Sequence, residues 1–122
     1  MKVIHTDRAP AALGPYSQAY ISNGFLFTSG QIGADPATGK AGATLAEQAE
    51  QVMKNLSALL EAAGTDFTRV VKTTCFLADM GDFAEFNEIY ARYFTGKPAR
   101  SCVAVKTLPK ELLVEVELIA EV

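Results

Sequence analysis

The chain has 122 residues, a formal net charge of −3 and a hydrophobic fraction of 49%. This length is sufficient for one hydrophobic core but not for two, so we expect a single domain over residues 1–122. With 11 Lys plus Arg against 14 Asp plus Glu and no basic cluster, the sequence lacks the electrostatic signature of a nucleic-acid-binding protein. Small-molecule metabolites are therefore the expected partners.

The N-terminal segment has no apolar run of signal-peptide length, because His5, Asp7 and Arg8 follow the first four residues. No segment approaches the length of a membrane span. We therefore expect a cytoplasmic protein with no membrane partner. The two cysteines, Cys75 and Cys102, are too few for a disulfide framework or a four-ligand zinc site, and we predict no bound metal.

The first half of the chain is predicted to form three strands and a helix. Strand-like runs occupy residues 3–5, 17–22 and 25–29, and Ser22-Asn23-Gly24 is typical of a hairpin turn. Thr44, followed three residues later by Glu47, forms a capping box that begins an amphipathic helix. We expect this helix to end near Ala63, before Gly64.

The second half is predicted to form three further strands and a second helix. The strands occupy residues 70–77, 100–106 and 113–121. The helix is predicted to begin at Asp82, with Glu85 three residues later, and to end at Gly96 before Pro98. Aromatic residues dominate its packing face.

The resulting order β, β, β, α, β, α, β, β predicts an α+β sandwich, with both helices on one face of a mixed sheet. The other face then has no cover, although it carries apolar residues such as Leu113 and Ile119. Self-association explains such a face most simply, and a symmetric oligomer would place its binding sites between subunits.

Arg100 stands at the start of an apolar, alternating strand, which is an unusual position for a cation. A partly buried guanidinium needs an anion or several acceptors, and its planar fork matches a carboxylate at two points. Arg100 therefore predicts a small anionic partner.

Strand periodicity suggests where the other polar groups lie. If the strands at 100–106 and 113–121 pair as antiparallel neighbours with their valines in the core, then Arg100 and Cys102 share a face with Glu115 and Glu117. A solvated sheet face with a cross-strand Arg–Glu pair accounts for the same pattern.

Three weaker motifs precede or lie between these strands. The glycine in Ser29-Gly30-Gln31 would let a ligand approach the backbone, although a bulge or turn is the commoner explanation. A turn followed by the start of a strand is indicated by Gly14-Pro15-Tyr16-Ser17-Gln18-Ala19. Asn87 interrupts the aromatic helix face, either as a satisfied core amide or as a ligand contact.

Taken together and in this order, four motifs resemble the RidA family, also called the YjgF/YER057c/UK114 family. They are Gly14-Pro15-Tyr16-Ser17-Gln18-Ala19, Ser29-Gly30-Gln31, Pro98-Ala99-Arg100-Ser101, and Leu108-Pro109 with Glu115-Val116-Glu117. The resemblance covers nearly the entire chain. It implies a chorismate-mutase-like α+β fold and a homotrimer with clefts between subunits.

The resemblance also implies an activity, which is hydrolysis of reactive 2-imino acids such as 2-iminobutanoate and 2-iminopropanoate, with their enamine tautomers, to 2-keto acids and ammonia. It implies no cofactor and no metal. Arg100 would clamp the substrate carboxylate, and Glu115 would orient or deprotonate the attacking water. The remaining cleft residues implied by the family are Tyr16, Ser29, Gly30, Asn87 and Cys102.

Two other functions fit the same residues. A non-catalytic module could use Arg100 to sense a 2-keto acid or another carboxylate metabolite, because function depends on sites rather than on folds. A protein-interaction or chaperone-like role would instead use the helical and oligomeric surfaces and would not require Arg100. The short Thr95-Gly96-Lys97 connection before Pro98 affects the rim of the cleft in either case.

Overall fold

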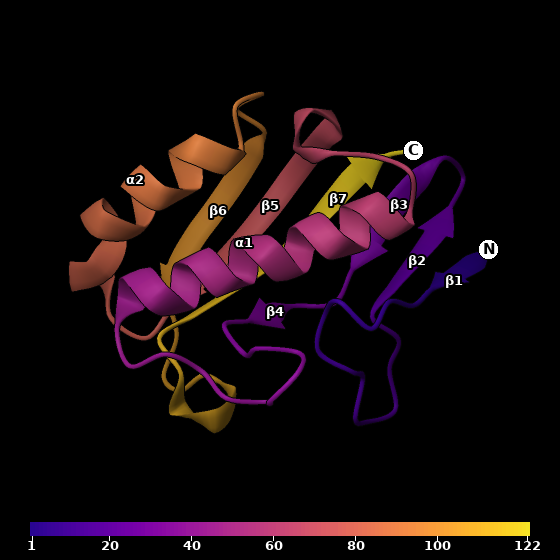
Figure 1. The fold of residues 1–122 in the computed structure, drawn as a ribbon. Helices are drawn as coiled ribbons and strands as arrows, with labels where there is room; N and C mark the ends of the chain where they lie inside the picture. The colour runs from indigo at the N-terminus through magenta and orange to yellow at the C-terminus, as the bar shows by residue number, and fades with distance from the viewer.

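The computed structural model describes residues 1–122 as one mixed sheet covered on one face by two helices (Figure 1). The helices are α1 (Leu45–Ala62) and α2 (Phe83–Tyr93), and the 3-10 turns are η1 (Phe67–Arg69), η2 (Met80–Asp82) and η3 (Pro109–Glu111). The strands are β1 (Lys2–Ile4), β2 (Ala19–Ser22), β3 (Phe25–Thr28), β4 (Gln31–Ile32), β5 (Val70–Leu77), β6 (Ala99–Ala104) and β7 (Val114–Glu121). The predicted α+β class is confirmed.

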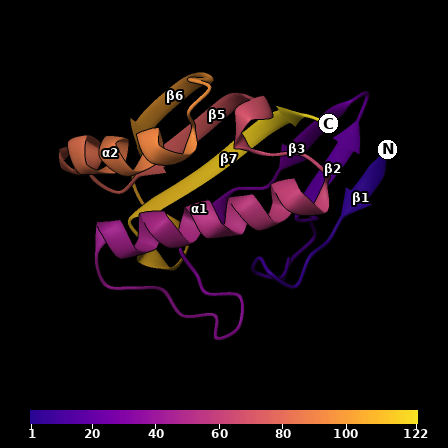
Figure 2. The ribbon, with the colours of Figure 1, turned by 45° about the horizontal axis from the view of Figure 1, so that its top comes forward.

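The sheet has the order β1-β2-β3-β7-β5-β6, with the short β4 paired to β7. All pairs are antiparallel except β5 and β6, which are parallel and joined through α2. Parallel neighbours need a crossover connection, and a helix supplies it. Figure 2 shows that α1 and α2 lie on the same side of the sheet, as the sequence predicted.

The local signals placed most elements to within two residues. The hairpin between β2 and β3 turns through Asn23 and Gly24, whose φ angles of 51° and 81° are those of a primed turn. At the start of α1, the hydroxyl of Thr44 accepts a hydrogen bond from the Glu47 amide at 3.2 Å. The predicted hairpin and first helix are therefore confirmed, whereas β4 was missed because two residues carry no periodicity.

The predicted cap of the second helix was wrong. Asp82 makes no side-chain capping bond, because the chain is already helical there as part of η2. Asp79 caps the turn instead, since its carboxylate accepts a hydrogen bond from the Gly81 amide at 2.8 Å. The helix also ends at Tyr93, three residues earlier than the predicted Gly96.

The conditional pairing of the last two strands was also wrong. β6 and β7 are not neighbours, because β5 lies between them. In the parallel ladder Arg100 is opposite Thr73 and Cys102 is opposite Cys75, so both face the helices. In the β5–β7 ladder the fully buried Val116 is opposite Cys75 and therefore shares that face. Because side chains alternate along a strand, Glu115 faces the other way.

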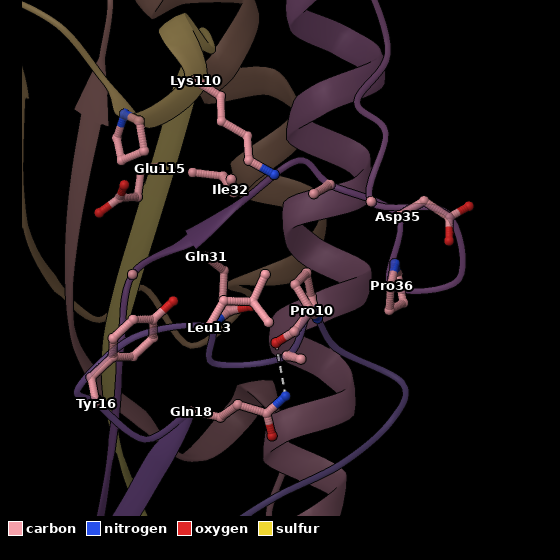
Figure 3. Close-up of a pocket in the computed structure, with 15 residues that line it drawn as sticks. Pro10, Leu13, Tyr16, Gln18, Gln31, Ile32, Asp35, Pro36, Lys110 and Glu115 are labelled. Atoms are coloured by element: carbon pink, nitrogen blue, oxygen red, sulfur yellow. Dashed lines mark hydrogen bonds between the residues drawn. The ribbon is translucent and has the colours of Figure 1, made fainter.

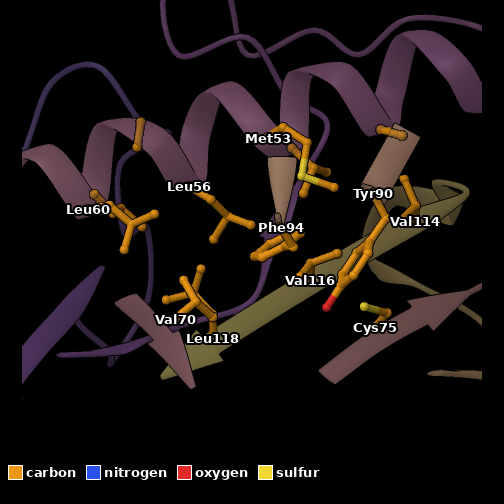
Figure 4. Close-up of a cluster of buried hydrophobic side chains, with 14 of the residues drawn as sticks. Met53, Leu56, Leu60, Val70, Cys75, Tyr90, Phe94, Val114, Val116 and Leu118 are labelled. Carbon is orange, nitrogen blue, oxygen red and sulfur yellow. The ribbon is translucent and has the colours of Figure 1, made fainter. Parts of the chain in front are cut away.

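The core fills the space between the sheet and the helices (Figure 4). Met53 and Leu56 of α1 and Phe94 at the end of α2 point toward Val116 and Leu118 of β7, and all five are at most 2% exposed. Burial of such side chains is the main favourable term in folding. The same packing fixes the orientation of α2 above β6.

The opposite face of the sheet is uncovered, and its part over β1, β2 and β3 is apolar. The strand registers align Val3, Tyr20, Phe27 and Ile119 across β1, β2, β3 and β7. The side chains of Val3, Tyr20 and Phe27 are 52%, 40% and 44% exposed. Contiguous exposed apolar surface of this kind marks an interaction surface. Arg100, contrary to the sequence prediction, does not lie on it.

The capping assignment can be tested with two neighbouring aspartates. Asp79→Ala removes the acceptor for the Gly81 amide, and we expect it to lower the free energy of unfolding by about 1 kcal/mol. Asp82→Ala, the matched control, removes no capping bond, so we expect a change within about 0.5 kcal/mol. Urea denaturation of both variants measures the difference, and a larger effect at Asp82 would contradict the assignment.

Candidate functional site

The first candidate cavity lies at one end of the sheet and has a volume of about 360 Å³ (Figure 3). Tyr16 reaches it from the loop before β2, Gly30 from the link between β3 and β4, and Glu115 from β7. β4 pairs with β7 beside this point, with Ile32 opposite Glu115. The pairing therefore brings three of the predicted site residues to one cavity.

Glu115 lies directly against Gly30. A Cβ atom built on Gly30 would stand 2.2 Å from one carboxylate oxygen of Glu115 and 2.7 Å from its carboxyl carbon. A side chain at position 30 therefore cannot coexist with the carboxylate in this position. The glycine is thus required for the carboxylate to lie where it does.

The Glu115 carboxylate has an environment that favours its protonated form. Burial raises its pKa above the ordinary 4.5, and the negative charge of Glu117 raises it further. No hydrogen bond or ion pair within the chain involves this carboxylate. A half-buried carboxylate with a raised pKa and free oxygens is suited to accept and return a proton.

The second candidate cavity lies between α2 and the start of β6, and it contains Arg100 and Asn87. Arg100 Nη1 donates a hydrogen bond to Asn87 Oδ1 at 2.6 Å. The guanidinium carbon lies 4.7 Å from the centre of the Tyr90 ring and 5.4 Å from that of Phe83. No carboxylate of the chain forms an ion pair with Arg100, so the positive charge stays available for a ligand.

Two of the predicted site residues lie in neither cavity. Ser29 donates its hydroxyl to the Ser17 carbonyl at 2.6 Å, which holds the loop before β2 against β3. Cys102 is half-buried, and burial raises the pKa of its thiol although Arg100 opposes the effect. Burial raises the pKa of its strand neighbour Cys75 to about 12, so that thiol is inert.

The structure thus divides the predicted site into two parts. Tyr16, Gly30 and Glu115 share one cavity, whereas Asn87 and Arg100 share the other. Arg100 faces the helices from the edge strand β6, and Glu115 projects from the opposite face of β7. The two charged groups therefore cannot contact one small ligand within a single chain.

Two features of the site were missed from the sequence. The first is the stacking of Tyr90 and Phe83 on Arg100. The helical spacing of the two aromatic residues was visible in the sequence, but their contact with Arg100 depends on the parallel pairing of β6 with β5. Lys110 lines the first cavity from a turn in which Lys110 and Glu111 both have positive φ, 58° and 54°. Consecutive left-handed residues that are not glycine are strained and concentrate at functional sites. In the sequence, the adjacent Leu108-Pro109 motif was the only indication of this turn.

Neither cavity contains a cluster of metal ligands. No group of three or more His, Cys, Asp or Glu side chains is arranged to hold a metal ion. No helix combines the length and the apolar character needed to cross a bilayer.

Comparison with known proteins identifies the family. The model of the Endoribonuclease L-PSP family matches residues 6–122. The rat protein named 2-iminobutanoate/2-iminopropanoate deaminase is 52% identical over 121 residues, covering 98% of this chain and 88% of its own length. The chain therefore belongs to the Endoribonuclease L-PSP family, and the resemblance to RidA proteins is confirmed.

Other relatives show how varied the names in this family are. The putative regulator AldR of Lactococcus lactis is 53% identical over 124 residues, covering 100% of this chain and 98% of its own. The crystal structure of Escherichia coli TdcF with bound serine superposes with a TM-score of 0.96 at 41% identity, covering 100% and 99% of the two chains.

The contact between Gly30 and Glu115 can be tested by adding one methyl group. We expect Gly30→Ala to push the Glu115 carboxylate toward solvent, because the new Cβ occupies its position. The pKa of Glu115 then falls toward its ordinary value, which a carbon-13 NMR titration of the carboxyl group measures. Gly96→Ala is the control, since a Cβ there meets the nearest atom at 3.4 Å. An unchanged Glu115 pKa in Gly30→Ala would refute the contact.

Proposed function

We propose that the protein hydrolyses 2-imino acids to 2-keto acids and ammonia, in clefts between the subunits of a homotrimer. In each cleft, Arg100 of one subunit binds the substrate carboxylate and Glu115 of the neighbouring subunit activates water. The observation that carries this proposal is the unpaired guanidinium of Arg100, held by Asn87 and aromatic rings and by no carboxylate of the chain.

The guanidinium of Arg100 is suited to a carboxylate ligand. It lies at a cavity, it is partly buried, and only one of its N–H groups is bonded within the chain. The remaining donors form a planar fork that matches the two oxygens of a carboxylate. A 2-imino acid presents that carboxylate next to its reactive C=N carbon.

The chemistry requires little more than an oriented water molecule. Water attacks the carbon of the protonated imine, forming a C–O bond, while Glu115 takes a proton from the water and the C=N electron pair moves to the nitrogen, which becomes an amine. Glu115 returns its proton to this amine, and the C–N bond then breaks as the new hydroxyl loses its proton to solvent, releasing ammonia and the 2-keto acid. The imine carbon is already electrophilic, so positioning supplies much of the rate increase. No cofactor enters this scheme.

Subunit assembly provides the means to bring the two halves together. Arg100 and Glu115 project from opposite faces of the sheet, so a complete site needs a second chain. The uncovered face offers Val3, Tyr20 and Phe27 as apolar contacts for such an assembly. A closed symmetric ring repeats the same contact at each interface and leaves no face open. The trimeric state is part of the proposal.

Two of the relatives support this choice, and a third favours an alternative. The rat relative is named as a deaminase of 2-iminobutanoate and 2-iminopropanoate. The TdcF structure contains serine, which also carries a carboxylate beside a nitrogen-bearing carbon. The name of the AldR relative favours the second candidate, a regulatory protein that binds a carboxylate metabolite without turnover.

A coupled assay distinguishes these functions. A threonine dehydratase releases 2-iminobutanoate in situ, and formation of 2-oxobutanoate is followed with no addition, with wild-type protein and with each variant. We expect wild-type protein to accelerate the reaction and Arg100→Ala to lose about a hundredfold in kcat/KM. Arg100→Lys keeps the charge without the fork, so we expect a smaller loss.

The control is Arg69→Ala, which removes an exposed arginine outside both cavities and should leave the rate unchanged. Saturable binding of 2-oxobutanoate without any acceleration by wild-type protein would establish the sensing function in place of the enzyme. Equal activity of wild type and Arg100→Ala would remove Arg100 from the site.

A further inference from the structure

We infer that Tyr90 is a positioning residue, which holds the guanidinium of Arg100 in the plane that receives the substrate carboxylate. The inference rests on the proposed role of Arg100. Tyr90 belongs to α2, whereas Arg100 lies on β6, so the arginine is positioned by a side chain from a different element.

Tyr90 is the middle member of a stack of three side chains. The Arg100 guanidinium carbon lies 4.7 Å from the centre of the Tyr90 ring. The Phe94 ring lies against Tyr90 at 4.3 Å between centroids, with an angle of 25° between the rings. A cation near the face of an aromatic ring is attracted by the ring quadrupole, more strongly where water is partly excluded. The stack therefore restrains the guanidinium from one side.

Tyr90 is itself fixed at both ends. Tyr90 as a whole residue is 8% exposed and packs in the core between the helix and the sheet. Its hydroxyl forms a 2.7 Å hydrogen bond with the hydroxyl of Thr73, the residue opposite Arg100 in the parallel ladder. Figure 4 shows the hydroxyl directed away from α2 toward the sheet. Because the Tyr90 ring is held against the sheet, the guanidinium that stacks on it is held in a fixed position relative to the sheet.

The chemical nature of these contacts explains why they suit a binding arginine. Asn87 accepts one hydrogen bond, and Tyr90 and Phe83 offer ring faces, so every partner of the guanidinium is neutral. A carboxylate partner would compete with the substrate for the same donors. Neutral partners hold the side chain while leaving its charge and its other N–H groups available.

Asn87 and Tyr90 restrain different motions of the same group. The hydrogen bond to Asn87 fixes one nitrogen at 2.6 Å, but rotation about that bond remains possible. The ring of Tyr90 restrains the plane of the guanidinium, and two-point binding of a carboxylate depends on that plane. Loss of Tyr90 should therefore weaken substrate binding without removing the charge.

The test replaces Tyr90 by Phe and by Leu. Tyr90→Phe keeps the ring face, so we expect KM for 2-iminobutanoate and Kd for 2-oxobutanoate to stay within about twofold of wild type. Tyr90→Leu removes the face, and we expect KM and Kd to rise about tenfold while kcat changes little. Ile89→Ala is the control, because Ile89 is a similarly buried apolar residue of α2 that lines neither cavity, whereas the Phe86 ring packs against Tyr90 itself at 5.8 Å between centroids.

A second readout keeps the test independent of turnover. The Arg100 Nε–Hε signal in ligand-free protein, observed by nitrogen-15 relaxation, reports the motion of the guanidinium. We expect it to be restrained in wild type and Tyr90→Phe and mobile in Tyr90→Leu. If wild type neither hydrolyses imines nor binds 2-oxobutanoate, the proposed function fails, whereas the relaxation result still decides the role of Tyr90.

Two results would overturn the inference. One is a Tyr90→Leu variant whose KM, Kd and Arg100 relaxation equal those of wild type. The other is a Tyr90→Leu variant that matches Ile89→Ala in every readout, including a lower Tm, because a general loss of core packing would then account for the change.

Discussion

The parallel pairing of β6 with β5 determines where the charged groups of the site lie. α2 closes the crossover, so the chain returns beside β5 in the same direction and β6 becomes the edge of the sheet. Arg100 consequently faces the helix layer, where Asn87 and Tyr90 reach it. β7 lies on the other side of β5 and directs Glu115 to the opposite face. The crossover through α2 thus places Arg100 and Glu115 on opposite faces of the sheet.

Each half of the site carries an ionisable side chain that the chain itself leaves without an ionic partner. Arg100 is held by neutral groups, and Glu115 lies half-buried against Gly30 with its pKa raised by burial. Unpaired charges of this kind oppose stability, and proteins retain them where a ligand completes the interaction. The separation of the two charges and the uncovered apolar side chains of β1, β2 and β3 together account for the proposed position of the clefts.

Local signals in the sequence predicted most of the elements, because caps, turns and periodicity act over a few residues. The Thr44 cap and the Asn23-Gly24 turn formed as expected. The strand that pairs with β6 could not be predicted this way. Alternation divides the side chains of a strand between two faces, but it leaves open which face meets the core and therefore how the strand is placed in the sheet. The motifs named Arg100 and Glu115 but not their separation, which depends on non-local strand order.

The most direct measurement combines two inactive chains. Arg100→Ala and Glu115→Gln variants are co-refolded in equal amounts, and imine hydrolysis is compared with each variant alone. If each cleft takes Arg100 from one chain and Glu115 from its neighbour, random assembly restores about a quarter of the sites, and activity returns in that proportion. No recovery from the mixture, although mass measurement shows mixed oligomers, would contradict a site shared between subunits.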